Sequence, residues 1–316
     1  MKKVFFTLLL ALFSLLVEAQ ESQTAYNFLR LPQSAHTAAL GGDIITVVED
    51  DLSMLFANPA LLSSVSDKTI QLGVMSYMEG SLMAGAAFNR NINEKASWAV
   101  SAQYMHYGTM KEVDEYNVQT GEFSAKDIAL NGTFSYQLGQ HLVGGITAKV
   151  INSYIGQFNS LAVGVDMGLN YYLPDGEWSL SAVVKNLGGE LDAYEEEYAK
   201  LPVDVQVGIS KRLVGSPLRL SVAMVDLNHW GYKFINHFVV GMDVILSPQI
   251  YLAAGYNFRR ANEMKIINTG DEKGSSHGAG LSLGAGVLLD RFKLNLSYAK
   301  YHVSSNSLMV NIAYTL

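Results

Sequence analysis

The residues that could carry acid–base or metal chemistry are scattered along this 316-residue sequence. Its seven histidines stand far apart: His36, His106, His141, His229, His237, His277 and His302. The absence of cysteine excludes thiol catalysis and thiolate metal ligands. The sequence also lacks the G-x-S-x-G, H-E-x-x-H and G-x-x-x-x-G-K patterns. We therefore expect no catalytic residues, no metal site, no cofactor and no enzymatic activity. A Ser-His-acid triad formed by distant segments is the remaining enzymatic alternative.

The densest local charge is the acidic segment LDAYEEEYAK, residues 191–200. Its carboxylates are ligands that a hard cation such as Ca²⁺ accepts. A run of like charges is more typical of a solvated loop, which is the interpretation we adopt. The whole chain has a net charge of -7 and no basic stripe. That balance excludes nucleic acid as a partner.

The first twenty residues have the pattern of a secretory signal peptide. Lysines at positions 2 and 3 precede the apolar run 4–17, and polar residues follow from Glu18. An apolar run of about 14 residues is shorter than the roughly 20 that a membrane-spanning helix needs. We expect residues 1–20 to be removed on export, with cleavage near Ala19 or Gln20.

The composition after the signal is that of a membrane protein built from strands. Hydrophobic residues make up 49% of the chain, charged residues only 16%, and there are 28 glycines. No later apolar segment is long enough to cross a bilayer as a helix. Every backbone polar group inside a bilayer must be paired within the protein, and a closed barrel of strands meets that requirement. We therefore predict an all-β transmembrane antiparallel barrel in the cell outer membrane of a Gram-negative bacterium.

Alternation of apolar with polar or small residues predicts about fourteen strands in a barrel domain at residues 68–316. Val203, Val205 and Val207, for example, are separated by Asp204 and Gln206. A period of two is typical of a strand with two different faces, and an even strand count suits a single-chain bacterial barrel. The predicted strands are 69–77, 81–90, 96–107, 126–138, 141–152, 160–172, 177–187, 203–213, 216–226, 235–246, 249–259, 277–288, 291–301 and 305–316.

The connections between these strands alternate in length. Long connections are predicted at 108–125, 188–202 and 260–276, and tight turns lie at every second joint. This parity predicts tight turns in the periplasm and long loops outside the cell. Aromatic residues near the strand ends are expected to form girdles at the two membrane interfaces: Tyr77, Tyr104, Tyr107, Tyr171, Tyr172, Trp178, Trp230, Tyr251 and Tyr301.

The predicted inward face is small and polar, as Gly208, Ser210, Ser221 and Ala223 illustrate. Such a face suits a narrow or filled lumen. The segment 21–67 has no alternation of period two, and we predict that it forms an N-terminal plug, or hatch. A soluble β-sandwich or lipocalin-like barrel also has alternating strands. A face rich in glycine, serine and alanine would, however, be a poor solvent-facing surface for a chain with so few charges.

Two motifs in this N-terminal region resemble a known family. FLRLPQSAHTAALGG covers residues 28–42, and EDDLSMLFANPALLS covers residues 49–63. They resemble the hatch of the PorV/PorQ family of the type IX secretion system of Bacteroidetes, on the side of the shorter PorQ members. That family belongs to the wider FadL-like outer-membrane barrels, so the resemblance implies a fourteen-stranded barrel with a hatch. The matching hatch residues are Gly41, Gly42, Asn58, Pro59 and Ala60.

The resemblance also implies a function and partners. It implies a barrel in contact with outer-membrane lipids that anchors a surface-exposed PorZ-like protein, in a cargo attachment complex with PorU and PorV. The acidic, tyrosine-rich loops suit a polar docking surface. Their candidate partner-facing residues are Glu112, Asp114, Glu115, Tyr116, Tyr194, Glu195, Glu196, Glu197 and Tyr198.

Two other functions remain open at this stage. A FadL-type channel for hydrophobic compounds such as long-chain fatty acids predicts an apolar pocket among the extracellular loops. A general porin predicts a wide aqueous lumen, which the small lumen residues and the expected plug disfavour.

Overall fold

The computed structural model describes residues 24–316, except 79, 195–197, 232, 266–277 and 304. The predicted signal peptide, residues 1–20, lies outside the described residues. Residues 24–68, here called the N-terminal segment, contain only short helices: η1 (Asn27–Arg30), α2 (Ala35–Ala39), η2 (Leu52–Phe56) and η3 (Pro59–Ser64). No helix in the described part of the chain is long and apolar enough to cross a membrane.

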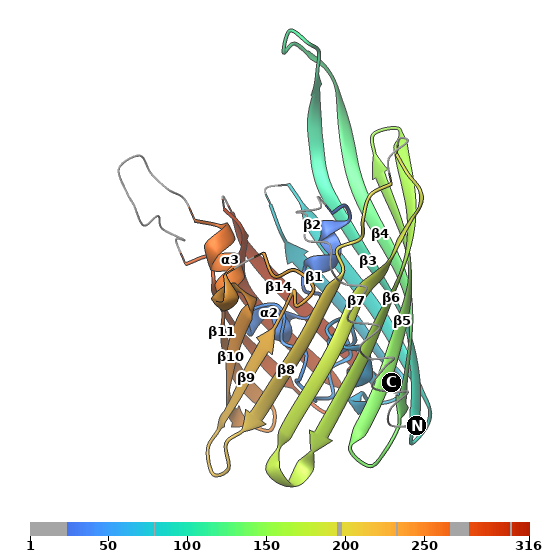
Figure 1. The fold of residues 1–316 in the computed structure, drawn as a ribbon. Coiled ribbons are helices and arrows are strands. Elements are labelled where there is room, and N and C mark those ends of the chain that lie inside the picture. Colours follow the sequence, from blue (N-terminus) through green and yellow to red (C-terminus); the bar gives the residue numbers. More distant parts are fainter. Residues whose placement is uncertain (1–23, 79, 195–197, 232, 266–277, 304) are drawn as a thin grey trace.

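The described residues after this segment form fourteen strands in a closed barrel (Figure 1). Each strand is antiparallel to the next, and β1 pairs with β14 to close the ring. The predicted fourteen-stranded barrel is therefore confirmed. The strands are β1 (Thr69–Ser76), β2 (Leu82–Asn93), β3 (Ala96–Val113), β4 (Gln119–Gln137), β5 (Leu142–Ile155), β6 (Phe158–Leu173), β7 (Trp178–Asp192), β8 (Asp204–Arg212), β9 (Leu218–Met224), β10 (Phe238–Ser247), β11 (Ile250–Asn257), β12 (Leu281–Leu288), β13 (Phe292–His302) and β14 (Ser305–Thr315). Three further short helices lie between strands: η4 (Pro174–Gly176), η5 (Phe234–His237) and α3 (Phe258–Glu263).

The two faces of the barrel wall have opposite polarity. In β1, Leu72 and Val74 point outward and are exposed, whereas Gln71 between Ile70 and Leu72 is buried inside. The same alternation recurs around the ring, with leucine, isoleucine and valine outside and serine, asparagine and threonine inside. An apolar exterior is unfavourable in water and favourable in hydrocarbon, so the wall faces lipid.

The two sides of the barrel differ in height. Strands β3–β7 contain 14 to 19 residues each, whereas β8–β12 contain 7 to 10. We call these arcs the tall wall and the short wall. Figure 1 shows the β3–β4 hairpin rising well beyond every other labelled strand.

The predicted loop at 108–125 is wrong, because most of it is strand. β3 continues to Val113 and β4 begins at Gln119, so the connection itself is only residues 114–118. Within the described residues, the register with β2 ends at His106 and that with β5 ends at Ala125. Beyond these points the two strands pair with each other, apart from a hydrogen bond of 3.0 Å from the Gly156 amide to the Ser124 carbonyl, and we call residues 107–124 the β3–β4 ribbon.

The observed bounds of the other two long loops differ less from the predicted ones. β7 continues to Asp192, so that connection covers residues 193–203. The connection after β11 begins with helix α3, and residues 266–277 of it lie outside the described residues.

Candidate functional site

The N-terminal segment contacts opposite arcs of the barrel. Its helix η3 packs against β3, β4, β5 and β6, whereas α2 packs against β11, β12, β13 and β14. These arcs face each other across a ring of fourteen strands. Figure 1 shows the segment, in blue, between the strands of the barrel. The segment therefore spans the lumen from one wall to the other.

The predicted motif Asn58-Pro59-Ala60 shapes the contact with the tall wall. Asn58 is fully buried, and its side-chain oxygen accepts a hydrogen bond of 3.0 Å from the Ala60 amide at the start of η3. Its amide nitrogen donates to the carbonyl of Ile45 at 3.2 Å and to that of Leu169 in β6 at 3.3 Å. Pro59 suits the first turn of the helix, where no backbone donor is needed. One asparagine thus caps η3 and fixes it to the barrel wall.

Two wall glycines make room for this motif. A Cβ atom on Gly145 of β5 would overlap the backbone of Pro59 and Ala60. A Cβ atom on Gly168 of β6 would overlap the Asn58 side chain. Only glycine permits such a close approach of backbone to backbone.

Gly41 and Gly42 lie at the short wall and end helix α2. Both have left-handed φ angles, +107° and +104°, which side-chain-bearing residues rarely adopt. The Gly41 carbonyl accepts a hydrogen bond of 3.1 Å from Asn257 at the end of β11. The five hatch residues predicted from sequence are therefore all buried, three at the tall wall and two at the short wall.

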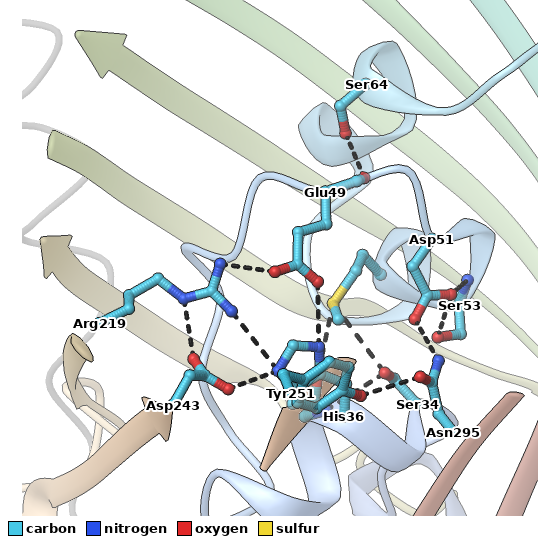
Figure 2. Close-up of polar contacts among 12 residues, drawn as sticks. Ser34, His36, Glu49, Asp51, Ser53, Ser64, Arg219, Asp243, Tyr251 and Asn295 are labelled. Atoms are coloured by element: carbon cyan, nitrogen blue, oxygen red, sulfur yellow. Dashed lines mark hydrogen bonds and ion pairs between the residues drawn. The ribbon is translucent and has the colours of Figure 1, made fainter. Parts of the chain in front are cut away.

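A buried cluster of charges joins α2 to the short wall (Figure 2). His36 Nε2 lies 2.7 Å from Asp243 of β10, and His36 Nδ1 lies 3.2 Å from Glu49. Arg219 of β9 contacts the same two carboxylates, Glu49 at 2.7 Å and Asp243 at 2.8 Å. The His36 ring stacks on Tyr251 of β11 at a centroid distance of 3.9 Å. We call these five residues the charge cluster.

The charge cluster is neutral when His36 is protonated, with two carboxylates facing two cations. Burial alone would lower the pKa of His36, but Asp243 and Glu49 outweigh it and raise that pKa to about 9. Burial alone would raise the pKa of Glu49, but Arg219 and His36 hold it well below its usual range. At neutral pH His36 is therefore a cation that donates a hydrogen bond to Asp243 and forms an ion pair with Glu49.

Further hydrogen bonds extend this attachment to β13. The Tyr251 hydroxyl donates to Asn295 Oδ1 at 2.9 Å, and Asn295 Nδ2 donates to Asp51 at 2.8 Å (Figure 2). Lys293, also on β13, lies 2.7 Å from Asp50. The prediction that Tyr251 belongs to a membrane girdle is wrong, because its ring points inward and stacks on His36.

A cavity of about 190 Å³ lies in the lumen next to the N-terminal segment. The barrel wall contributes charged side chains, including Lys149 and Asp166, which form an ion pair at 2.7 Å. The segment contributes apolar side chains, including Leu29, Leu31 and Phe56. The described residues contain no group of three histidines and carboxylates placed to hold a metal ion.

The structure divides the predicted partner-facing residues into two places. Glu112, Asp114, Glu115 and Tyr116 lie on the ribbon, where Asp114 caps the turn by accepting from the backbone amides of Tyr116 and Val118, both at 2.9 Å. Tyr116 is 78% exposed.

The second group lies in the connection after β7. Tyr194 is half-buried with its hydroxyl out of contact with solvent, whereas Tyr198 is exposed. Glu195, Glu196 and Glu197 lie outside the described residues.

Comparisons with known proteins agree with this architecture. No protein-family model matches the sequence, and no curated protein matches it. Among solved structures, the FadL homologue of Pseudomonas aeruginosa superposes with a TM-score of 0.56 at 11% identity, over 89% of this chain and 98% of that chain. The toluene transporter TodX of Pseudomonas putida gives a TM-score of 0.56 at 12% identity, over 90% and 96%. The monoaromatic hydrocarbon channel CymD gives 0.57 at 11% identity, over 92% and 98%.

These similarities establish a shared fold, and the polarity of the wall establishes the environment. The exterior is apolar around the whole ring, and the interior is polar. The chain is therefore an outer-membrane β-barrel that has the fold of the FadL-type outer-membrane proteins.

Proposed function

We propose that this barrel is a PorQ-like anchoring subunit of the type IX secretion system, which holds a PorZ-like partner at the cell surface. In this proposal the N-terminal segment is a permanent plug and the β3–β4 ribbon is the docking element. The partner belongs to an attachment complex that also contains PorU and PorV.

The attachment of the N-terminal segment to both walls supports a closed lumen. The tall wall holds η3 through Asn58 and wall glycines, and the short wall holds α2 through the charge cluster. Removing one partner of a buried ion pair lowers stability by about 3–5 kcal/mol, so displacing the plug is strongly unfavourable. A barrel with a fixed plug suits anchoring better than transport.

The observation that carries the docking role is the ribbon. Its two strands pair with each other from Thr109 opposite Ser124 to Val113 opposite Gln119, beyond the last residues paired with β2 and β5. Such a ribbon has free backbone edges, to which a partner can add a strand. Exposed Val113, Tyr116 and Val118 supply apolar contacts next to acidic Glu112 and Asp114.

Shortening the ribbon tests this role directly. Residues 110–123 are replaced by Asn-Gly, which joins the paired residues Thr109 and Ser124 by a two-residue hairpin turn. We expect the barrel to assemble while the partner and type IX cargo are lost from the cell surface, as measured by surface labelling. A matched control replaces residues 303 and 304, which follow β13 and precede β14 in the sequence, by Asn-Gly. Retention of cargo and partner by cells with the shortened ribbon would rule out the docking role.

A second candidate is a FadL-type channel for hydrophobic compounds such as long-chain fatty acids. The fold shared with TodX and CymD favours it. The lumen cavity has an apolar side formed by Leu29, Leu31 and Phe56 and a charged side that includes Lys149. That combination suits an amphipathic molecule better than a plain hydrocarbon.

The two functions make different predictions for one pair of variants. Cross-linking the N-terminal segment to the wall, by a bismaleimide spacer between Asp50→Cys and Lys293→Cys, leaves anchoring intact and abolishes fatty-acid uptake if the plug must move. The ribbon deletion abolishes anchoring and leaves fatty-acid uptake intact. Uptake of labelled fatty acid by a deletion strain complemented with each variant distinguishes the channel from the anchor.

A further inference from the structure

The connection between β9 and β10, residues 225–237, has its polarity reversed. Asp226, Asn236 and His237 are buried toward the barrel interior. Trp230 and Phe234 are 61% and 63% exposed, and Ile235 is also exposed. A loop in water would bury its aromatic residues and expose its polar ones. We call Trp230, Phe234 and Ile235 the loop patch.

The loop patch continues the apolar exterior of the barrel. Phe234 packs edge-to-face against Phe238 at a centroid distance of 5.2 Å. Phe238 is on the outward face of β10, where it is paired with outward Met224. On the adjacent strand, Tyr256 packs edge-to-face against Phe258 at 4.9 Å. Aromatic residues therefore line the upper end of β10 and β11 and extend into the loop.

The strands below this loop are short for a bilayer. β9 has 7 residues. At roughly 3.4 Å per residue and a tilt of about 45°, it covers about 17 Å of an apolar band about 25 Å tall. On the tall wall, strands of 14 to 19 residues cover the whole band. At β9 the upper part of the band is thus left to be covered by another element.

We propose that the described residues of the loop 225–237 lie in the outer leaflet, where Trp230, Phe234 and Ile235 contact lipid acyl chains and complete the apolar band above β9. In this placement exposed Lys233, next to Phe234, is positioned to meet lipid phosphates. Tryptophan at this level is typical of the membrane interface. The sequence places Trp230 near a strand end, but only the structure shows that it lies six positions beyond the end of β9.

The inner side of the loop fixes its position. Asp226 forms ion pairs with Arg259 of α3 and, at 3.6 Å, with Arg30 of the N-terminal segment. The His237 ring contacts the Val225 carbonyl at 2.8 Å, and Trp230 packs against His237 at 5.1 Å. The polar side of the loop is therefore attached to the lumen, which leaves its apolar side to face outward.

Depth-dependent quenching of Trp230 fluorescence tests this placement. The chain has three tryptophans, so the Trp98→Phe/Trp178→Phe variant retains only Trp230. In phosphatidylcholine vesicles with brominated acyl chains we expect blue-shifted emission and loss of most of the intensity, with little quenching by aqueous iodide. The Trp178→Phe/Trp230→Phe variant, which retains outward Trp98, is the lipid-exposed control. A tryptophan-free chain with Tyr116→Trp, at the ribbon tip, is the water-exposed control.

A second label keeps the test independent of the tryptophan substitutions. The chain has no cysteine, so Phe234→Cys and Tyr116→Cys each accept a single nitroxide in an otherwise native barrel. Oxygen, which partitions into lipid, should relax the label at 234 more than a water-soluble nickel chelate does, and the reverse should hold at 116. Quenching of Trp230 by iodide but not by lipid bromine, together with nickel-dominated relaxation at 234, would overturn the proposal. The purified chain suffices, so the result does not depend on a secretion partner or a transported compound.

Discussion

The tall wall and the short wall hold the same N-terminal segment by different physical means. On the tall wall, Gly145 and Gly168 let the backbone of the Asn58 motif approach the strands closely. On the short wall, Arg219 and Asp243 form a buried charge cluster with His36 and Glu49. The first contact depends on shape and the second on charge. The two contacts should therefore respond to different perturbations.

Removing one charge from the short wall should have the largest effect. Arg219→Met leaves Glu49 and Asp243 buried with a single cation, a loss of about 3–5 kcal/mol in the free energy of unfolding. Urea unfolding of the purified barrel measures it. The control is Arg212→Met, which breaks an exposed pair with Glu177 and should cost about 1 kcal/mol or less. Equal losses in the two variants would contradict a special role for the buried cluster.

The charge on the short wall should also make the protein sensitive to alkali. The pKa of His36 is raised from 6.5 to about 9, so its contribution is complete below pH 6.5 and is lost as the pH rises through 9. At about 1.4 kcal/mol per pKa unit, the loss is of the order of 3 kcal/mol. Unfolding midpoints measured across this range should fall for the natural chain and stay level for His36→Gln. A fall of the same size in His36→Gln would assign the effect to another group.

A change of shape on the tall wall should cost somewhat less. Gly145→Val forces a side chain into the backbone of Pro59 and Ala60, and overpacking of this kind typically costs about 1–3 kcal/mol. We expect protease cleavage within residues 24–68 while the barrel stays intact, and no change in pH dependence. Gly132→Val adds the same side chain where nothing lies within 4 Å, and it should remain resistant to protease.

The smallest effect on stability is expected at the tip of the ribbon. Tyr116→Ala removes an exposed side chain and should change the free energy of unfolding by less than about 0.5 kcal/mol. If the ribbon docks a partner, the same variant should reduce the amount of partner recovered with the barrel from solubilised outer membranes. Val303→Ala, exposed in another loop, is the matched control for that recovery. Unchanged recovery with Tyr116→Ala would remove this tyrosine from the docking surface.

The strands could be predicted wherever the membrane imposes two different environments on the two faces. The fourteen predicted ranges each correspond to one strand, from 69–77 for β1 to 305–316 for β14. The prediction failed in the ribbon, where VDEYNVQTGE has no apolar alternation. Both faces of a ribbon beyond the membrane meet water, so its sequence carries no pattern of period two.

The charge cluster could be predicted only in part. Arg219 and Asp243 occupy inward positions of otherwise apolar strands, which marks them as lumen residues with an ionic partner. In the sequence, Arg219 lies 183 positions from His36 and Asp243 lies 207 positions from it. No local sequence pattern encodes contacts over such separations. The hatch residues, by contrast, were predicted from contiguous motifs, and the structure places all five in buried positions.

The seam between the first and last strands sets an order of assembly. Closure pairs Thr69 with Thr315, and the N-terminal segment joins this seam through the Gln33 carbonyl, which accepts from Asn311 at 3.2 Å. Contacts between residues so distant in the sequence form slowly because long chain segments must first be brought together. A segment attached to both walls cannot easily be inserted into a finished ring. We therefore expect the barrel to close around residues 24–68, with the interior occupied before the last pair of strands joins.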